Sequence, residues 1–120
     1  MGPIASPAPV QATIFVLTCL FIGKDRGTMP PTPKVDRTRT WGWYPSFDLA
    51  TQAAMDNDGD MYEMGYYNAV VIEEYPCGTM ELPVAEHWFM VDYDPSREYP
   101  YDVAPIAKRP ALESIVSFAW

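Results

Sequence analysis

The sequence predicts an α+β fold, in which one main helix packs on a small antiparallel sheet of four to five strands. Segments rich in β-branched and aromatic residues alternate with loops, and one segment has apolar residues at helical spacing. Proline accounts for 13 of the 120 residues, a share that argues against a helical bundle or a coiled coil. Hydrophobic residues make up 48% of the chain, as in one ordinary globular domain.

The first residues differ in composition from the rest. Residues 1–11 combine prolines with small residues and bury too little surface to offset chain entropy, which predicts a flexible tail. Residues 12–120 are then expected to form a single α+β domain.

The first strand of this domain is expected over residues 13–22, where β-branched and aromatic residues lack strict alternation. This pattern is typical of a central strand covered on both faces.

A loop and a second strand are expected next. Residues 23–36 contain three prolines and two glycines, which predicts an exposed loop with a potential role in function. Residues 37–44 alternate long polar side chains with others, as a strand with one solvent face does. Pro45 is expected to end this strand.

The one clear helix is expected after this proline. Ser46 is a good N-cap, and apolar residues follow at helical spacing for about ten residues, up to Asn57. Gly59 is expected to supply the left-handed stop. The stretch 56–60 is rich in aspartate but does not fit an EF-hand, because Met61 and Tyr67 occupy the positions of its glycine and glutamate.

The second half of the domain is expected to add two strands and a closing element. Residues 66–75 contain a run of β-branched residues and predict a buried strand, and residues 87–94 alternate as a strand does. The proline-rich stretch 95–110 predicts a loop. Residues 112–120 fit either a short strand or a helical turn.

Charge is distributed unevenly along the chain. Lys and Arg number 8 against 16 Asp and Glu, a net charge of −8. Residues 1–45 carry five basic and two acidic side chains, whereas residues 46–120 carry three basic and fourteen acidic ones. Direct nucleic-acid binding is not expected, because it needs clustered Lys and Arg. The acidic part can steer a cationic partner or can serve as a solvated surface that maintains solubility.

No enzymatic signature is found. The chain has no phosphate loop and no dinucleotide fingerprint, and its two cysteines lack the spacing of a zinc site, so we expect no metal and no cofactor. Cys19 and Cys77 are expected to be buried thiols, and a single disulfide bridge between them is the less favoured alternative. His87 is the only histidine, and nothing in the sequence places it beside Cys77. Glu73 and Glu74 should point to opposite faces of a strand, which prevents them from forming an acid and base pair.

Aromatic residues exceed what a small core can hold, so some should lie on the surface. Tyrosines interleaved with carboxylates are typical of protein-binding hot spots. The predicted partner-binding residues are Asp56, Asp58, Asp60, Glu63, Tyr66, Tyr67, Glu73 and Glu74. A second hypothesis is a small-ligand site, where Arg37, Arg39 and Trp43 bind a nucleotide. A third is a structural component of a phage assembly, with the tail as an arm.

Part of the chain resembles a group of small uncharacterised accessory proteins of bacteria and their phages. The shared pattern covers about residues 40–75 and consists of Gly42-Trp43-Tyr44, a short helix, Asp60-Met61-Tyr62-Glu63, and a tyrosine-rich strand with Val71-Ile72-Glu73-Glu74. Small acidic accessory proteins of phages often act by binding: they occlude a nucleic-acid-binding surface of a host enzyme or defence complex, or they sequester a signalling nucleotide. The uneven charge and the surplus of aromatic residues favour the first, so we expect a non-enzymatic acidic binding protein that inhibits such a host protein. It would act in the manner of anti-CRISPR proteins, with its acidic surface imitating nucleic acid.

The expected location is the cytoplasm of the host cell. The longest mostly apolar segment, residues 12–23, is shorter than the roughly twenty residues of a membrane span, and no basic region precedes it. Because the chain is acidic, the expected partner is a host protein with a basic surface. The sequence leaves the oligomeric state open.

Overall fold

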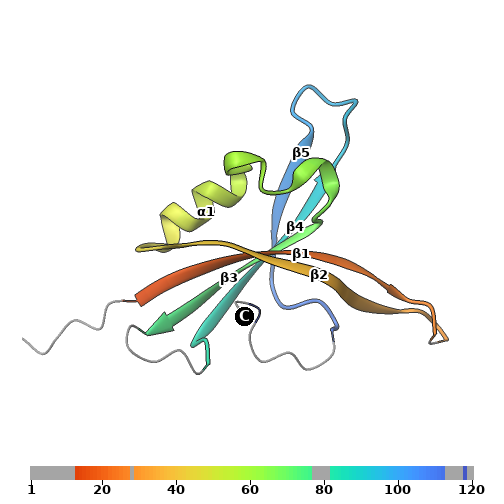
Figure 1. The fold of residues 1–120 in the computed structure, drawn as a ribbon, viewed down its shortest axis with the longest axis horizontal. Coiled ribbons are helices and arrows are strands. Elements are labelled where there is room, and N and C mark those ends of the chain that lie inside the picture. Colours follow the sequence, from red (N-terminus) through yellow and green to blue (C-terminus); the bar gives the residue numbers. More distant parts are fainter. Residues whose placement is uncertain (1–12, 28, 77–81, 113–117, 119–120) are drawn as a thin grey trace, which may run out of the picture.

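The computed structural model describes residues 13–27, 29–76, 82–112 and 118, and has one five-stranded antiparallel sheet with one α-helix packed on it (Figure 1). This confirms the predicted α+β fold. The strand order is β2-β1-β3-β4-β5. The elements are β1 (Thr13–Asp25), β2 (Thr32–Tyr44), α1 (Phe47–Met55), the 3-10 turns η1 (Asp58–Asp60) and η2 (Glu63–Gly65), β3 (Ala69–Pro76), β4 (Ala85–Tyr93) and β5 (Tyr101–Ile106). The predicted tail, residues 1–11, and Cys77 lie outside the described residues.

Strand β1 lies between two neighbours, as predicted for residues 13–22. It pairs with β3 from Thr13 to Leu20 and with β2 along its whole described length after Ile14. Beyond Leu20, β1 pairs with β2 alone, and the two strands continue as an arm that extends past the rest of the sheet (Figure 1). The predicted loop over residues 23–36 is therefore wrong for residues 23–25, which belong to β1, and for residues 32–36, which belong to β2. Strand β2 thus begins five residues earlier than predicted and ends at Tyr44, directly before Pro45, as predicted. Pro33 is accommodated because β2 is an edge strand, where a missing N–H is tolerated.

Helix α1 begins where the sequence indicates and ends earlier. The backbone N–H of Leu49 donates to Oγ of Ser46 at 3.2 Å, which confirms the predicted N-cap. The helix ends at Met55, because Asn57 already adopts a left-handed conformation with φ 48°. Gly59, the predicted stop, is also left-handed with φ 62°, but it lies inside the following turn.

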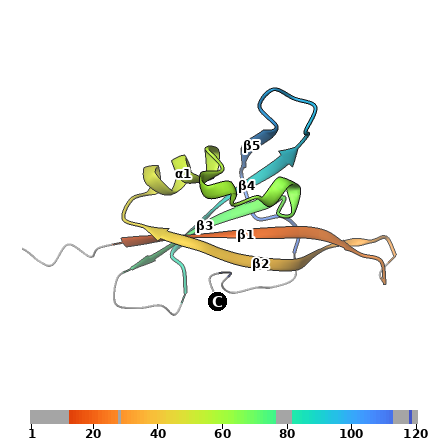
Figure 2. The same cartoon turned by 45° about the horizontal axis from the view of Figure 1, so that its top comes forward.

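Both faces of the sheet are covered. On one face, α1 and the turns after it pack on β1 and β3 through a core that includes Leu17, Ile72 and Tyr62 (Figure 2). On the opposite face, Leu112 and Phe118 pack against a cluster around Val71 and Trp88. This two-sided burial explains why β1 and β3 lack alternation between apolar and polar residues.

The later strands are shifted from the predicted ranges. β3 begins at Ala69 instead of residue 66, since the 3-10 turns occupy the residues before it. β4 starts two residues earlier than predicted. β5 forms within residues 95–110, where the prolines predict a loop, so that prediction is wrong for residues 101–106. Pro105 is compatible with a strand because β5 is the other edge of the sheet. Of the predicted closing element, residues 113–117 and 119–120 lie outside the described residues.

Candidate functional site

An acidic turn, residues 56–63, connects α1 to the rest of the domain. Four non-glycine residues in and next to it have positive φ, namely Asn57, Asp60, Glu63 and Met64. Side chains hold these conformations in place: Oδ1 of Asn57 accepts from the backbone N–H of Tyr62 at 2.9 Å, and its Nδ2 donates to Oδ1 of Asp60 at 3.1 Å. The turn is therefore a defined structure that presents its carboxylates in fixed positions.

Two carboxylates of the acidic turn have partners within the chain. Oδ1 of Asp60 also accepts from the hydroxyl of Tyr101 at 3.1 Å, and that hydroxyl accepts from the N–H of Met64. Glu63 lies 3.6 Å from Nη1 of Arg39 in an exposed ion pair. Asp60 and Glu63 therefore use their carboxylates for contacts within the chain.

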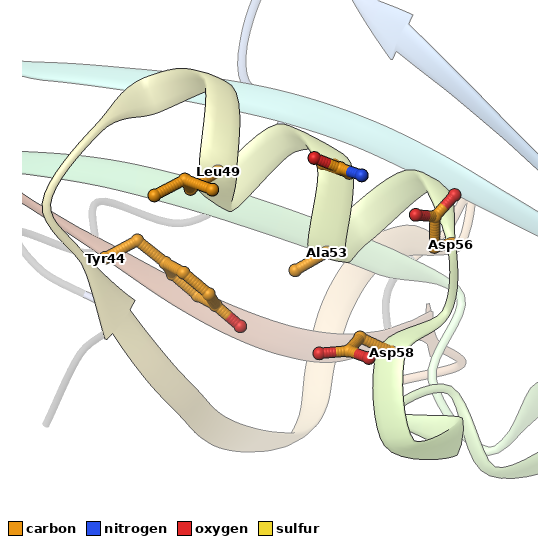
Figure 3. Close-up of a pocket in the computed structure, with 6 residues that line it drawn as sticks. Tyr44, Leu49, Ala53, Asp56 and Asp58 are labelled. Atoms are coloured by element: carbon orange, nitrogen blue, oxygen red, sulfur yellow. The ribbon is translucent and has the colours of Figure 1, made fainter.

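Asp56 and Asp58 differ from these two, because none of the ion pairs within the described residues involves them. Both are exposed and line a pocket of about 240 Å³ between α1 and the end of β2 (Figure 3). The pocket is lined by Tyr44, Leu49, Gln52, Ala53, Asp56 and Asp58.

The pocket has an apolar side and an acidic end. Leu49 and Ala53 project from α1, and the ring of Tyr44 lies opposite them with its hydroxyl pointing toward Asp58 (Figure 3). Burial, and in second place the carboxylate of Asp58, raises the pKa of Tyr44. The phenol is therefore neutral at physiological pH and can donate a hydrogen bond.

The sequence pointed to Asp56 and Asp58 but missed the pocket beside them. Gln52 and Ala53 lie three and four residues after Leu49, and Asp56 lies four and three residues after them, which places these residues on one side of a helix. That spacing was a usable signal. The approach of Tyr44 to the helix depends on the pairing of β1 with β2, and short-range sequence patterns do not report such pairing.

Four of the predicted partner-binding residues, Tyr66, Tyr67, Glu73 and Glu74, lie outside both the acidic turn and the pocket. Tyr67 and Glu73 are buried, with 5% and 0% exposure. Glu74 points to the helix side of the sheet, where Oε1 lies 2.7 Å from Nε2 of His87. Tyr66 is half-exposed, and its ring lies 3.7 Å from the guanidinium of Arg37. Asp56 and Asp58 are therefore the members of the predicted set that line the pocket.

Glu73 lies on the sheet face opposite α1. Its two carboxylate oxygens accept from the backbone N–H of Phe118 at 3.1 and 3.2 Å. Burial raises its pKa, and the hydrogen bond from Phe118 offsets part of that shift. Glu73 and Glu74 thus point to opposite faces, as predicted, and Glu73 anchors the backbone of Phe118 to the sheet.

The residues of the nucleotide hypothesis do not converge. Arg39 pairs with Cys19, which belongs to the core under α1, whereas Trp43 pairs with Val16, which packs on the opposite face. Arg37 already stacks between the rings of Phe21 and Tyr66, and its Nε donates to the carbonyl of Tyr66 at 3.0 Å. Arg37 and Arg39 therefore lie on the sheet face opposite Trp43.

Cys19 is fully buried, which confirms the prediction for this thiol, and burial raises its pKa to about 12. The thiol is therefore protonated at pH 8, and a protonated thiol is a poor nucleophile. We therefore expect the Cys77→Ser variant, whose one thiol is Cys19, to resist iodoacetamide under native conditions. It should be fully alkylated after denaturation. Mass spectrometry checks this, and rapid native alkylation would show that the core under α1 opens.

His87 is partly exposed, and its ring packs against that of Phe47 in a tilted arrangement with the centroids 4.4 Å apart. Its imidazole and the carboxylate of Glu74 form a hydrogen-bonded pair.

Among the described residues, no group of three or more His, Cys, Asp or Glu is arranged to hold a metal ion. None of the helices in the described ranges is long and apolar enough to cross a membrane.

No family model, curated protein or solved structure matches this chain. The resemblance of residues 40–75 to phage and bacterial accessory proteins therefore stays a prediction.

Proposed function

We propose that this protein is a non-enzymatic acidic binding protein that recognises a basic surface of a host protein. Its target would be a nucleic-acid-binding enzyme or a defence complex, which it inhibits by occupying the surface made for phosphate. Such a role suits an accessory protein of a phage or mobile element that acts in the host cytoplasm. The proposal makes no use of a metal, a cofactor or a reaction.

The observation that carries the proposal is the acidic pocket beside a rigid turn. Asp56 and Asp58 are exposed, and neither takes part in the ion pairs of the described residues. The hydrogen bonds of Asn57 hold the turn between them in one conformation. A preorganised pair of carboxylates loses little entropy when a cationic group binds.

Apolar and aromatic residues next to the carboxylates support the same role. Leu49 is 48% exposed and lines the pocket, and Met55 and Tyr99 are exposed as well. The hydroxyl of Tyr99 donates to the carbonyl of Met55 at 3.4 Å, so these two residues are neighbours. Exposed apolar side chains next to charged ones are common at protein interfaces.

The proposal predicts that capture of the partner depends on Asp56 and Asp58 and on salt. Tagged protein would be incubated with host lysate at low and at high ionic strength, and retained proteins identified by mass spectrometry. We expect a basic nucleic-acid-binding protein to be retained at low salt and lost at high salt. The Asp56→Asn/Asp58→Asn variant should retain at most about one tenth as much of it.

A matched control removes the same charge elsewhere. Asp36 on the β1–β2 arm and Asp102 on β5 are exposed, and the Asp36→Asn/Asp102→Asn variant should capture as much as the wild type. The purified target should also lose its affinity for nucleic acid when this protein is added. Equal loss of capture in both double variants would mean that net charge alone attracts the target, and the proposed site would then be wrong.

A further inference from the structure

We infer that the pocket of Tyr44, Leu49, Gln52, Ala53, Asp56 and Asp58 receives a single arginine side chain of the partner. This inference rests on the proposed function and specifies what the partner inserts. Its evidence is the size of the pocket, the chemistry of its walls and the position of its carboxylates.

The size of the pocket selects a side chain over a larger ligand. Its volume of about 240 Å³ lies below the roughly 300–1,000 Å³ of pockets that enclose drug-sized molecules. A nucleotide would not be enclosed here. The space is sufficient for one long side chain that enters from the surface.

The walls suit a side chain with an apolar stem and a charged end. Leu49 and Ala53 offer aliphatic contacts along α1, and Tyr44 offers the face of its ring (Figure 3). Arginine and lysine both bury their methylene stems against such surfaces while the charged end reaches a polar group. The amide of Gln52 lies on the same lining and can accept a hydrogen bond.

The acidic end favours arginine over lysine. Asp56 and Asp58, on either side of Asn57, both line the pocket, so carboxylate oxygens of two residues are available at its acidic end. A guanidinium has five N–H donors in a planar fork and can stack on an aromatic ring, whereas an ammonium is a compact and strongly hydrated charge. The Tyr44 ring and the two carboxylates therefore match both properties of the guanidinium.

Occupation by arginine also fits the charges around the pocket. The basic groups of β2 that face the helix side, Arg37 and Arg39, are held by Tyr66 and by Glu63. In the described residues they have their own partners outside the pocket lining. The pocket therefore presents its two carboxylates to a cation from another molecule.

The test uses small probes, so it does not depend on finding the partner. The full chain, labelled with ¹⁵N, would be titrated with N-acetyl-arginine amide, with the lysine analogue and with the uncharged citrulline analogue at low salt. We expect the arginine probe to shift the backbone amide signals of residues 49–58. The Asp56→Asn/Asp58→Asn variant should bind it about tenfold more weakly, and Asp36→Asn/Asp102→Asn should bind as the wild type does.

The lysine and citrulline probes test the chemistry of the group. Citrulline keeps the shape of arginine without its charge and should cause no shifts in residues 49–58. Lysine should bind several-fold more weakly than arginine, and equal binding would overturn the choice of arginine. Shifts that persist unchanged in the Asp56→Asn/Asp58→Asn variant, or an absence of shifts at the pocket, would overturn the pocket itself.

The capture experiment and the probe titration test the two claims separately. If the arginine probe does not bind while capture of the protein partner still depends on Asp56 and Asp58, the proposed function stands and the inference about arginine is wrong. If the probe binds but no host protein is captured, the pocket stands and the proposed function is wrong.

Discussion

Replacing Tyr62 by alanine is expected to lower the free energy of unfolding by about 3–5 kcal/mol, the usual range for removing a large aromatic side chain from a core. Tyr62 is fully buried between α1 and the sheet. Its hydroxyl donates to the carbonyl of Ala54 at 2.6 Å, and its N–H donates to Asn57. One side chain thus joins the helix end, the acidic turn and the core.

The Tyr62→Phe variant separates the hydroxyl from the ring. It keeps the packing and leaves the buried carbonyl of Ala54 without this donor, so we expect a loss of about 1–2 kcal/mol. Urea unfolding followed by circular dichroism measures both variants. A loss below about 1 kcal/mol for Tyr62→Ala would show that the turn and α1 contribute little to the stability of the sheet. Single domains are stable by about 5–15 kcal/mol, so the expected loss is a large share of the total.

The elements that the sequence predicts correctly are those whose signal is local. Ser46 begins α1 because a hydroxyl at the N-cap satisfies a free N–H within three residues. The run of β-branched residues in β1 and β3 indicated burial on both faces, and α1 and Phe118 cover the two faces of the sheet. Local composition was sufficient in both cases.

The parts predicted wrongly depend on position in the sheet. Pro33 and Pro105 suggested loops, yet both lie in edge strands, where one side of the backbone has no ladder partner. Edge position follows from the strand order, and no window of residues reveals that order. Glu73 was placed on a binding surface for a similar reason, because the residue that covers it, Phe118, lies 45 positions away.

Only part of the candidate site could be predicted from the sequence. The carboxylates of Asp56 and Asp58 were visible as a charge pattern, but the sequence could not separate them from Asp60, which has partners inside the chain. The separating contact comes from Tyr101, 41 residues later, on another strand. Which carboxylates remain for a partner is a property of the tertiary structure.

The second large effect is expected for Arg109→Met. Nε and Nη2 of Arg109 donate to the two carboxylate oxygens of Glu86 at 2.8 Å each, and the side chains are 26% and 25% exposed. Glu86 pairs across the strands with Glu73, so this guanidinium is close to two carboxylates. Breaking a buried ion pair costs about 3–5 kcal/mol and an exposed one less than about 1. For this partly buried pair we expect a loss of about 2 kcal/mol at pH 7.

The pH dependence tests the origin of that loss. The hydrogen bond from Arg109 lowers the pKa of Glu86, so the pair stabilises the fold above the ordinary pKa of 4.5, and this stabilisation is lost as the pH falls through the lowered pKa. The difference in stability between Arg109→Met and the wild type should therefore shrink in acid.

Glu73 is expected to show the opposite pH dependence. Burial raises the pKa of Glu73, so its contribution to the stability of the fold has the opposite sign and is lost as the pH rises. Glu73→Gln, which keeps one oxygen acceptor for Phe118, should consequently be more stable than the wild type at pH 7 and lose this advantage below pH 4.5. Urea midpoints across this pH range measure both variants, and parallel pH profiles would show that neither carboxylate couples to folding.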